Sequence, residues 1–215
     1  MSRILVFGDS IAYGANDITG GGWVQYLRSY FDNERVRDPK KDFSVYNQSV
    51  SGNTTFGLID RVETETKYRT QEDQKDIIVF AIGINDSAIR ESPQDKGRTS
   101  KEQFRHNLSS LIRKATHYVD GRIIFIGLTP VDETKTNPIS WNSVLYTNER
   151  IRQFENAILE TAEENKLPFI PIFESLINTN YKPMFPDGLH PDTKGHELIF
   201  KTVKDYLEKN KVIEF

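Results

Sequence analysis

The sequence predicts an α/β fold in which helices cover both faces of a central, parallel, five-stranded sheet. Short apolar runs alternate with longer amphipathic segments along the 215 residues, and this order of elements is typical of a parallel sheet. Residues 77–82 are continuously apolar, as expected for a strand that is buried on both faces. No internal repeat, low-complexity tract or linker divides the chain, so we expect a single domain over residues 1–215.

The first half of the chain supplies three of the expected strands and two helices. Residues 4–7 are a short run of β-favouring side chains, which predicts the first strand. In residues 23–31, aromatic and aliphatic side chains recur at helical spacing and lie on one face of the expected helix. We assign residues 43–50 to the second strand and residues 55–68 to a more highly charged helix. The apolar run at residues 77–82 is the third strand.

The second half of the chain continues this alternation. Ser100 is followed three residues later by Gln103, which is the spacing of a capping box. This pair predicts the start of a helix that continues through Ala115. Residues 123–126 form the expected fourth strand, and residues 148–165 form the helix that follows it.

The fifth strand is expected over residues 169–173, where Pro168 and Pro171 indicate an edge strand because proline cannot donate to a sheet. The last helix is expected over residues 194–209. Two irregular stretches, which are either lids over a site or tolerated surface insertions, are residues 91–99 and 131–145.

Composition excludes several classes of protein. A net charge of -3 argues against electrostatic binding to nucleic acid. The chain has no cysteine, which excludes a thiol nucleophile, a cysteine-ligated metal and a disulfide. No segment approaches the roughly 18 apolar residues of a membrane helix, and the N-terminus lacks the apolar stretch of a secretion signal. We therefore expect a cytoplasmic protein with no nucleic-acid partner and no stable membrane association.

Polar residues follow the strands at the points where ligands bind in parallel α/β sheets. Such ligands lie beyond the carboxyl ends of the strands, which meet at one edge of the sheet. Small or polar residues of catalytic type occur in four separate segments, and we expect these segments to converge on that edge. They are residues 8–10, 51–53, 83–86 and 187–191.

Ser10 and His190 are the candidates for nucleophile and base. Taken alone, Ser10 is more simply explained as a turn or capping residue, because a serine attacks a carbonyl only when a base removes its proton. Among the four histidines, His190 differs because it lies in a turn three residues after Asp187. A carboxylate at this spacing can hold the imidazole in one tautomer. His196, in the last helix, is expected to be solvated.

Three groups are candidates for binding an oxyanion. They are the backbone N–H of Ser10, the backbone N–H of Gly52 and the side-chain amide of Asn85. Each has a simpler alternative, since glycine and asparagine are common turn residues. We interpret Asp86 as a structural cap or turn anchor.

The four segments together resemble the SGNH hydrolases, also called the GDSL esterase/lipase family. The segments Gly-Asp-Ser-Ile at residues 8–11, Ser-Gly-Asn at 51–53, Gly-Ile-Asn-Asp at 83–86 and Asp-Gly-Leu-His-Pro at 187–191 occur in the family's order. Isoleucine replaces the leucine of the family name, which is a conservative change. The Gly-x-Ser-x-Gly elbow of the α/β-hydrolases is absent around the serine.

This resemblance implies a three-layer, flavodoxin-like fold and a serine esterase that acts on carboxylic esters, with short-chain acyl or acetyl esters expected. It implies Ser10 as nucleophile, His190 as base and Asp187 as its partner. Ser10, Gly52 and Asn85 would form the oxyanion hole. No metal or organic cofactor is implied, and the expected partner is a small-molecule ester; the oligomeric state stays open.

The sequence leaves two alternative functions open. A thioesterase or lysophospholipase of the same family is one alternative. A non-catalytic phosphate- or nucleotide-binding protein is another, because glycines at residues 20–22 precede a helix, although no Gly-Lys-Ser/Thr motif follows.

The expected substrate contacts are Trp141, Tyr146 and Phe185. We expect no metal site, because the only close group of candidate ligands, formed by His190, Asp192 and His196, has no further nearby histidine or carboxylate to complete a coordination shell.

Overall fold

The computed structural model describes residues 2–71, 74–90 and 99–210, and its centre is a parallel sheet. The five strands lie in the order β2-β1-β3-β5-β7, which is the flavodoxin-like order. This confirms the predicted α/β fold with a central parallel five-stranded sheet. The strands are β1 (Ser2–Gly8), β2 (Phe43–Asn47), β3 (Ile77–Ala81), β5 (Ile123–Ile126) and β7 (Phe169–Ile170).

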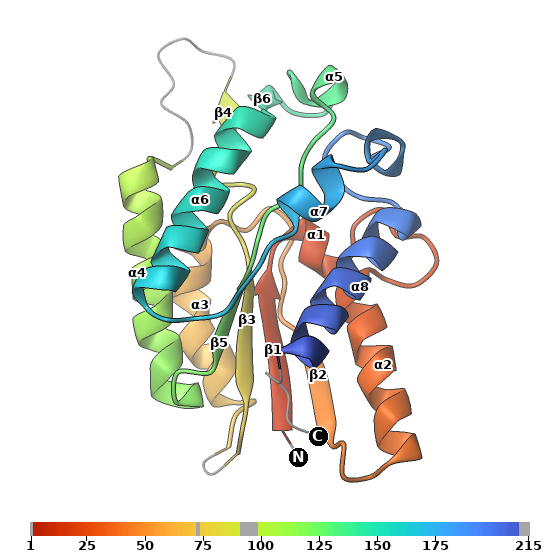
Figure 1. Cartoon of the computed structure of the whole chain (residues 1–215). Coiled ribbons are helices and arrows are strands. Elements are labelled where there is room, and N and C mark those ends of the chain that lie inside the picture. Colours follow the sequence, from red (N-terminus) through yellow and green to blue (C-terminus); the bar gives the residue numbers. More distant parts are fainter. Residues whose placement is uncertain (1, 72–73, 91–98, 211–215) are drawn as a thin grey trace.

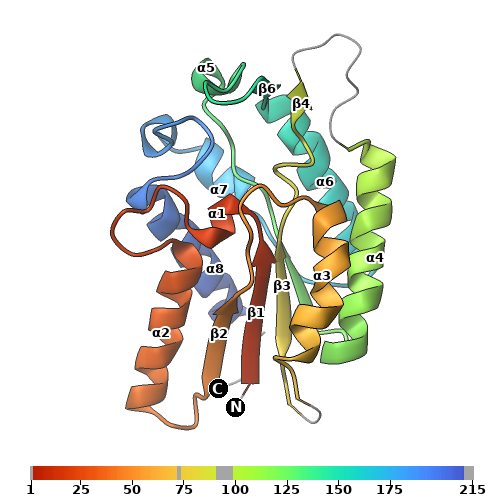
Figure 2. The same cartoon turned by 180° about the vertical axis from the view of Figure 1, so that it is seen from behind.

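Helices cover both faces of the sheet and complete three layers (Figures 1 and 2). Helices α3, α4 and α6 pack together on one face, and α2 packs with α8 on the other. The long helices are α2 (Trp23–Arg37), α3 (Thr55–Lys67), α4 (Lys101–Val119), α6 (Asn148–Glu164) and α8 (Thr193–Lys209). The short ones are α1 (Ser10–Tyr13), α5 (Glu133–Thr136), α7 (Phe173–Ile177) and the 3-10 turn η1 (Lys182–Met184).

Side-chain caps define where most of the long helices begin. The Ser100 hydroxyl accepts a hydrogen bond from the N–H of Gln103 at 3.1 Å, so the predicted helix start is confirmed. Thr54, Thr147 and Asp192 cap α3, α6 and α8 in the same way. Each cap satisfies a backbone donor that the first turn of a helix leaves without an intrahelical partner.

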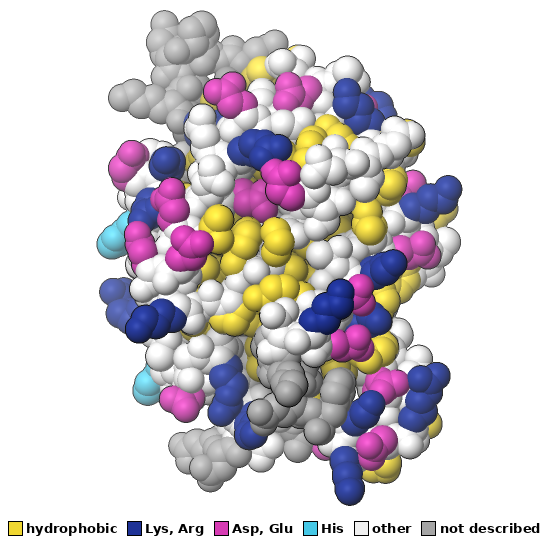
Figure 3. Space-filling view, in the orientation of Figure 1, with side chains coloured by type: hydrophobic (Ala, Val, Ile, Leu, Met, Phe, Trp, Pro, Cys, Tyr) yellow, Lys and Arg dark blue, Asp and Glu magenta, His cyan; other side chains and the backbone are white. Residues whose placement is uncertain are grey.

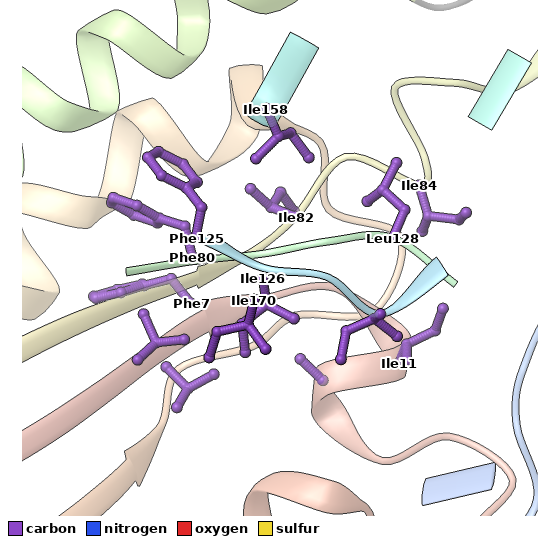
Figure 4. Close-up of a cluster of buried hydrophobic side chains, with 14 of the residues drawn as sticks. Phe7, Ile11, Phe80, Ile82, Ile84, Phe125, Ile126, Leu128, Ile158 and Ile170 are labelled. Atoms are coloured by element: carbon purple, nitrogen blue, oxygen red, sulfur yellow. The ribbon is translucent and has the colours of Figure 1, made fainter. Parts of the chain in front are cut away.

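The core lies between the sheet and its helices, and a row of phenylalanines crosses its middle. Phe7, Phe80 and Phe125 occupy matching register positions on three adjacent strands. Their ring centroids are 6.1 Å and 5.4 Å apart, and all three side chains are buried. Figure 4 shows this row at one end of the cluster and Ile11 and Ile84 at the other end. These two residues come from the segments that follow β1 and β3, so the core extends to the carboxyl edge of the sheet.

Several element boundaries differ from the prediction. Strand β2 ends at Asn47 rather than at residue 50, although the N–H groups of Gln48 and Val50 still bond to β1 carbonyls. Strand β7 has only two residues, because Pro171 cannot donate to the sheet and α7 begins at Phe173.

The stretch at residues 131–145 is not irregular as predicted. It contains α5 and the strand β6 (Val144–Leu145), which pairs antiparallel with β4 (Ile89–Arg90). Residues 91–98 of the other predicted loop lie outside the described residues. Strand β4 follows the segment at residues 83–86 closely in sequence, so the β4/β6 sheet lies beyond the carboxyl edge of the central sheet (Figure 1).

The surface is mixed in charge. On the face in Figure 3, acidic and basic side chains are interspersed and form no large patch of one sign. Within the described ranges, no helix combines the length and apolar character needed to span a bilayer.

Candidate active site

The turn after β1 places Ser10 at the carboxyl edge of the sheet. Asp9 caps the short helix α1, accepting a hydrogen bond from the N–H of Ile11 at 3.0 Å. A Cβ added at Gly8 would lie 2.5 Å from the Cβ of Ala12 and 2.7 Å from the carbonyl oxygen of Ala81. Only glycine fits there, so the chain can turn sharply from the strand into a helix that begins with the serine.

Ser10, His190 and Asp187 form one hydrogen-bonded line. The Ser10 Oγ lies 2.8 Å from Nε2 of His190, although the two residues are 180 positions apart in sequence. His190 Nδ1 lies 2.7 Å from Oδ2 of Asp187. The carboxylate also accepts the N–H groups of His190 and Leu189 on Oδ1, at 2.7 Å and 2.9 Å. With Nδ1 donating to the carboxylate, Nε2 carries the lone pair that faces the serine hydroxyl.

Asp187 is electrostatically stabilised as a carboxylate. Burial alone would raise its pKa, but the hydrogen bonds from the His190 side chain and from the backbone N–H groups of His190 and Leu189 outweigh burial and lower the pKa to about 2. Asn16 makes a further contact, with its Nδ2 donating to Oδ2 at 2.8 Å. Sequence analysis missed Asn16, whose role depends on a left-handed backbone (φ 67°) that asparagine tolerates.

The two other oxyanion candidates lie at the same edge. Val50 N–H donates to the carbonyl of Gly8 at 3.1 Å, which holds the segment containing Gly52 beside the end of β1. Gly52 has a left-handed backbone (φ 77°), and the space where a side chain would project is open. Asn85 Nδ2 donates to the carbonyl of Asn53 at 3.0 Å, so the segments after β2 and β3 are joined.

Asp86 anchors the segment that carries Asn85. Its carboxylate accepts the N–H of Thr55 at 3.0 Å, the hydroxyl of Thr55 at 2.6 Å and the hydroxyl of Thr99 at 3.1 Å. Burial raises the pKa of Asp86. The bonds agree with the interpretation of Asp86 as a structural anchor, here tying the turn after β3 to the start of α3.

Of the three expected substrate contacts, the structure leaves one accessible. Trp141 is 54% exposed and its ring is stacked on the His190 imidazole, with centroids 6.0 Å apart and planes 19° apart. The side chains of Tyr146 and Phe185 are buried, so neither presents a surface to solvent in this structure. Phe185 packs edge-on against Tyr181. The rings of Tyr146 and Phe185 lie in the core because burial of their apolar area is favourable.

His196 is buried rather than solvated as expected. Its Nε2 donates to the carbonyl of Ala15 at 3.0 Å, and its Nδ1 accepts the N–H of Trp23 at 3.4 Å. Burial lowers the pKa of this imidazole, which favours the neutral form. His196 therefore ties α8 to the chain that follows Ser10.

The glycines at residues 20–22 bind a carboxylate of the chain itself. Asp17 accepts the N–H of Gly20 at 3.2 Å and the N–H of Gly22 at 2.8 Å. It also accepts the hydroxyl of Thr193, at the start of α8, at 2.8 Å. Two of the three glycine N–H groups that the nucleotide hypothesis requires, those of Gly20 and Gly22, are thus already paired. In the described part of the chain, no three histidine, aspartate or glutamate side chains lie close enough together to hold a metal ion.

Comparison with known proteins gives a consistent answer over nearly the whole chain. The sequence model of the GDSL-like lipase/acylhydrolase family matches residues 6–198. Esterase TesA from Pseudomonas aeruginosa is 26% identical over 200 residues, which is 93% of this chain and 85% of that protein.

Solved structures show the same fold. The lipase/acylhydrolase from Enterococcus faecalis superimposes with a TM-score of 0.74 at 20% identity, over 98% of this chain and 97% of that chain. An acetylxylan esterase from Geobacillus stearothermophilus has a TM-score of 0.72 at 20% identity, over 97% of this chain and 93% of that one. Because the family match spans all four sequence segments, the chain belongs to the GDSL-like lipase/acylhydrolase family and is a carboxylic ester hydrolase.

Proposed function

We propose that the protein is a serine esterase that hydrolyses small carboxylic esters with short acyl groups through an acyl-enzyme. The observation that carries this proposal is the line of hydrogen bonds from Ser10 Oγ through the His190 imidazole to Asp187, at 2.8 Å and 2.7 Å. A nucleophile within bonding distance of a base that a third group orients is the arrangement required for nucleophilic catalysis.

In the proposed mechanism His190 moves one proton in each half-reaction. Nε2 takes the proton of Ser10 as Oγ bonds to the ester carbonyl carbon, and Asp187 stabilises the imidazolium that forms. Collapse of the tetrahedral intermediate breaks the bond to the leaving alcohol, which receives that proton. Water then attacks the acyl-enzyme by the same route, with His190 as base, and releases the acid and free Ser10.

The N–H of Ser10, the N–H of Gly52 and the Asn85 amide are proposed to stabilise the oxyanion. Loss of one such donor typically costs about 3–4 kcal/mol of transition-state stabilisation. The open space beside Gly52 supports this role, because a substrate carbonyl can approach its N–H without meeting a side chain.

The size of the cavity near Ser10 supports small substrates. The cavity beneath α1, lined by Ile11, Ile84 and Thr129 among others, holds only about 30 Å³. This is about the volume of one water, so an acyl chain cannot enter the core there. Trp141 stacks on the imidazole that protonates the leaving group, so we assign its exposed ring to the leaving-group side. Two similar proteins are named as esterases, which agrees with ester hydrolysis.

The test is hydrolysis of p-nitrophenyl esters by the wild type and by Ser10→Ala. We expect activity on the acetate ester that declines with acyl length, and a loss of at least about 10³-fold in the variant. Ser109→Ala, at an exposed site on α4, is the control and should keep full activity. Activity that survives in Ser10→Ala contradicts the serine mechanism. A preference for acyl thioesters or lysophospholipids over simple esters would favour the two alternatives within the family.

A further inference from the structure

We propose that Tyr146 is a positioning residue that holds the Asn85 amide with its nitrogen toward the substrate carbonyl. The inference rests on the proposed function, in which Asn85 stabilises the oxyanion. It also replaces the sequence-based expectation that Tyr146 contacts substrate. Tyr146 and Asn85 are 4% and 5% exposed, so solvent does not substitute for the contact between them.

The amide of Asn85 is held at both ends. Its Nδ2 donates to the carbonyl of Asn53 at 3.0 Å, and the Tyr146 hydroxyl donates to its Oδ1 at 3.3 Å. A carbonyl only accepts, so a flipped amide would place its oxygen against the oxygen of Asn53. With Nδ2 fixed on that side, the tyrosine satisfies Oδ1, which would otherwise be a buried acceptor without a partner.

The remaining hydrogen on Nδ2 is the one available to an oxyanion. Donation to Oδ1 draws electron density from the amide, which strengthens the N–H as a donor because linked hydrogen bonds polarise one another. The contribution of Tyr146 therefore grows with the charge that develops on the carbonyl oxygen. Tyr146 acts through Asn85, and its effect is mainly to stabilise the transition state.

The β4/β6 sheet and α5 hold Tyr146 rigidly in this place. Thr136, which is fully buried, bonds to both backbone groups of Tyr146. Its hydroxyl donates to the tyrosine carbonyl at 2.8 Å, and its carbonyl accepts the tyrosine N–H at 3.0 Å. Tyr146 directly follows β6, and β6 pairs with β4, which begins four residues after Asn85. The antiparallel pairing of β6 with β4 thus places the Tyr146 hydroxyl next to the Asn85 amide.

Tyr146→Phe removes one oxygen and keeps the ring. We expect kcat for a short ester to fall about tenfold while KM changes by less than about twofold. In the Asn85→Ala background the same substitution should have no further effect on kcat, because its target amide is gone. Where turnover of Asn85→Ala is too slow to follow, the labelling rate of Ser10 by a fluorophosphonate serves as the measurement.

Tyr181→Phe is the matched control. Tyr181 is also buried and its hydroxyl donates to the Val131 carbonyl at 3.1 Å, so its removal costs a similar bond away from the site. This variant should keep kcat. An unchanged kcat in Tyr146→Phe overturns the proposal, as does an equal fall in kcat with and without Asn85. A failure of the serine mechanism would appear separately, as activity that survives in Ser10→Ala.

Discussion

Two aspartates lie beside the hydrogen bond between Ser10 and His190, and the fold shifts their pKa values in opposite directions. Asp187 accepts enough hydrogen bonds to outweigh burial, and its pKa is about 2. Asp9 is fully buried beside Ser10, and burial raises its pKa to about 7 despite the N–H groups of Ile11 and Ala12. Below pH 7 Asp9 is therefore mostly protonated, whereas Asp187 beside the His190 imidazole remains a carboxylate.

This contrast predicts that neutral replacements of the two aspartates differ in their effect. Asp187→Asn should lower kcat/KM by about 10²–10⁴-fold, because the amide cannot hold the productive tautomer or stabilise the imidazolium. Asp9→Asn mimics the protonated carboxyl and still caps α1, so it should cost far less at pH 6. Steady-state kinetics of both variants at that pH test the prediction. A larger loss in Asp9→Asn would contradict it.

At the scale of elements, hydrogen bonds to Thr193 and His196 connect the chain between α1 and α2 to α8. Asp17 accepts the Thr193 hydroxyl at 2.8 Å, and Ala15 accepts His196 Nε2 at 3.0 Å. Burial would raise the pKa of Asp17, but hydrogen bonds from Tyr26, Gly22, Thr193 and Thr19 lower it. The segments that carry Ser10 and His190, which are far apart in sequence, are thereby fixed relative to each other.

Loss of the Asp17 carboxylate should loosen this connection. Asp17→Ala leaves the N–H groups of Gly20 and Gly22 and the Thr193 hydroxyl without their acceptor, which we expect to cost about 1–3 kcal/mol. For a chain of this size, that corresponds to a fall in Tm of about 2–12 °C in thermal unfolding. Asp38→Ala is the control, since Asp38 accepts one local N–H, that of Lys40. Equal melting temperatures for the two variants would refute the prediction.

At the scale of the whole molecule, a buried glutamate makes stability depend on pH. Glu155 on α6 is 8% exposed, and burial raises its pKa from 4.5 to about 8 despite a hydrogen bond from the N–H of Phe173. Between these two values the folded chain holds a proton that the unfolded chain has released. The free energy of unfolding therefore decreases as pH rises through this window.

Glu155→Gln should make the free energy of unfolding fall less as pH rises. The amide is neutral at every pH, so this variant should lose less Tm than the wild type between pH 5 and pH 8. Glu160→Gln, on the same helix but exposed and paired with Arg105, should retain the slope of the wild type. Thermal melts across the pH range measure both. The same slope in Glu155→Gln and wild type would show that this carboxyl does not titrate between the two values.

The fold class and the meeting of the four polar segments at one sheet edge follow from sequence because they depend on local patterns. Continuous apolar runs such as residues 77–82 specify buried strands, and the polar residues that follow parallel strands meet at one edge. The approach of Ser10 to His190 is a consequence of that rule. The cap at Ser100, which was predicted, likewise depends on a neighbour three residues away.

Burial and the pairing of distant side chains were decided only in the tertiary structure. Nothing within a few residues of Tyr146, Phe185 or His196 indicates that each is enclosed, because their neighbours come from other elements. The contact of Asn16 with Asp187 and the pairing of β4 with β6 join segments that sequence proximity does not link. Local patterns determine the elements and their order, whereas partners and solvent exposure depend on packing among elements distant in sequence.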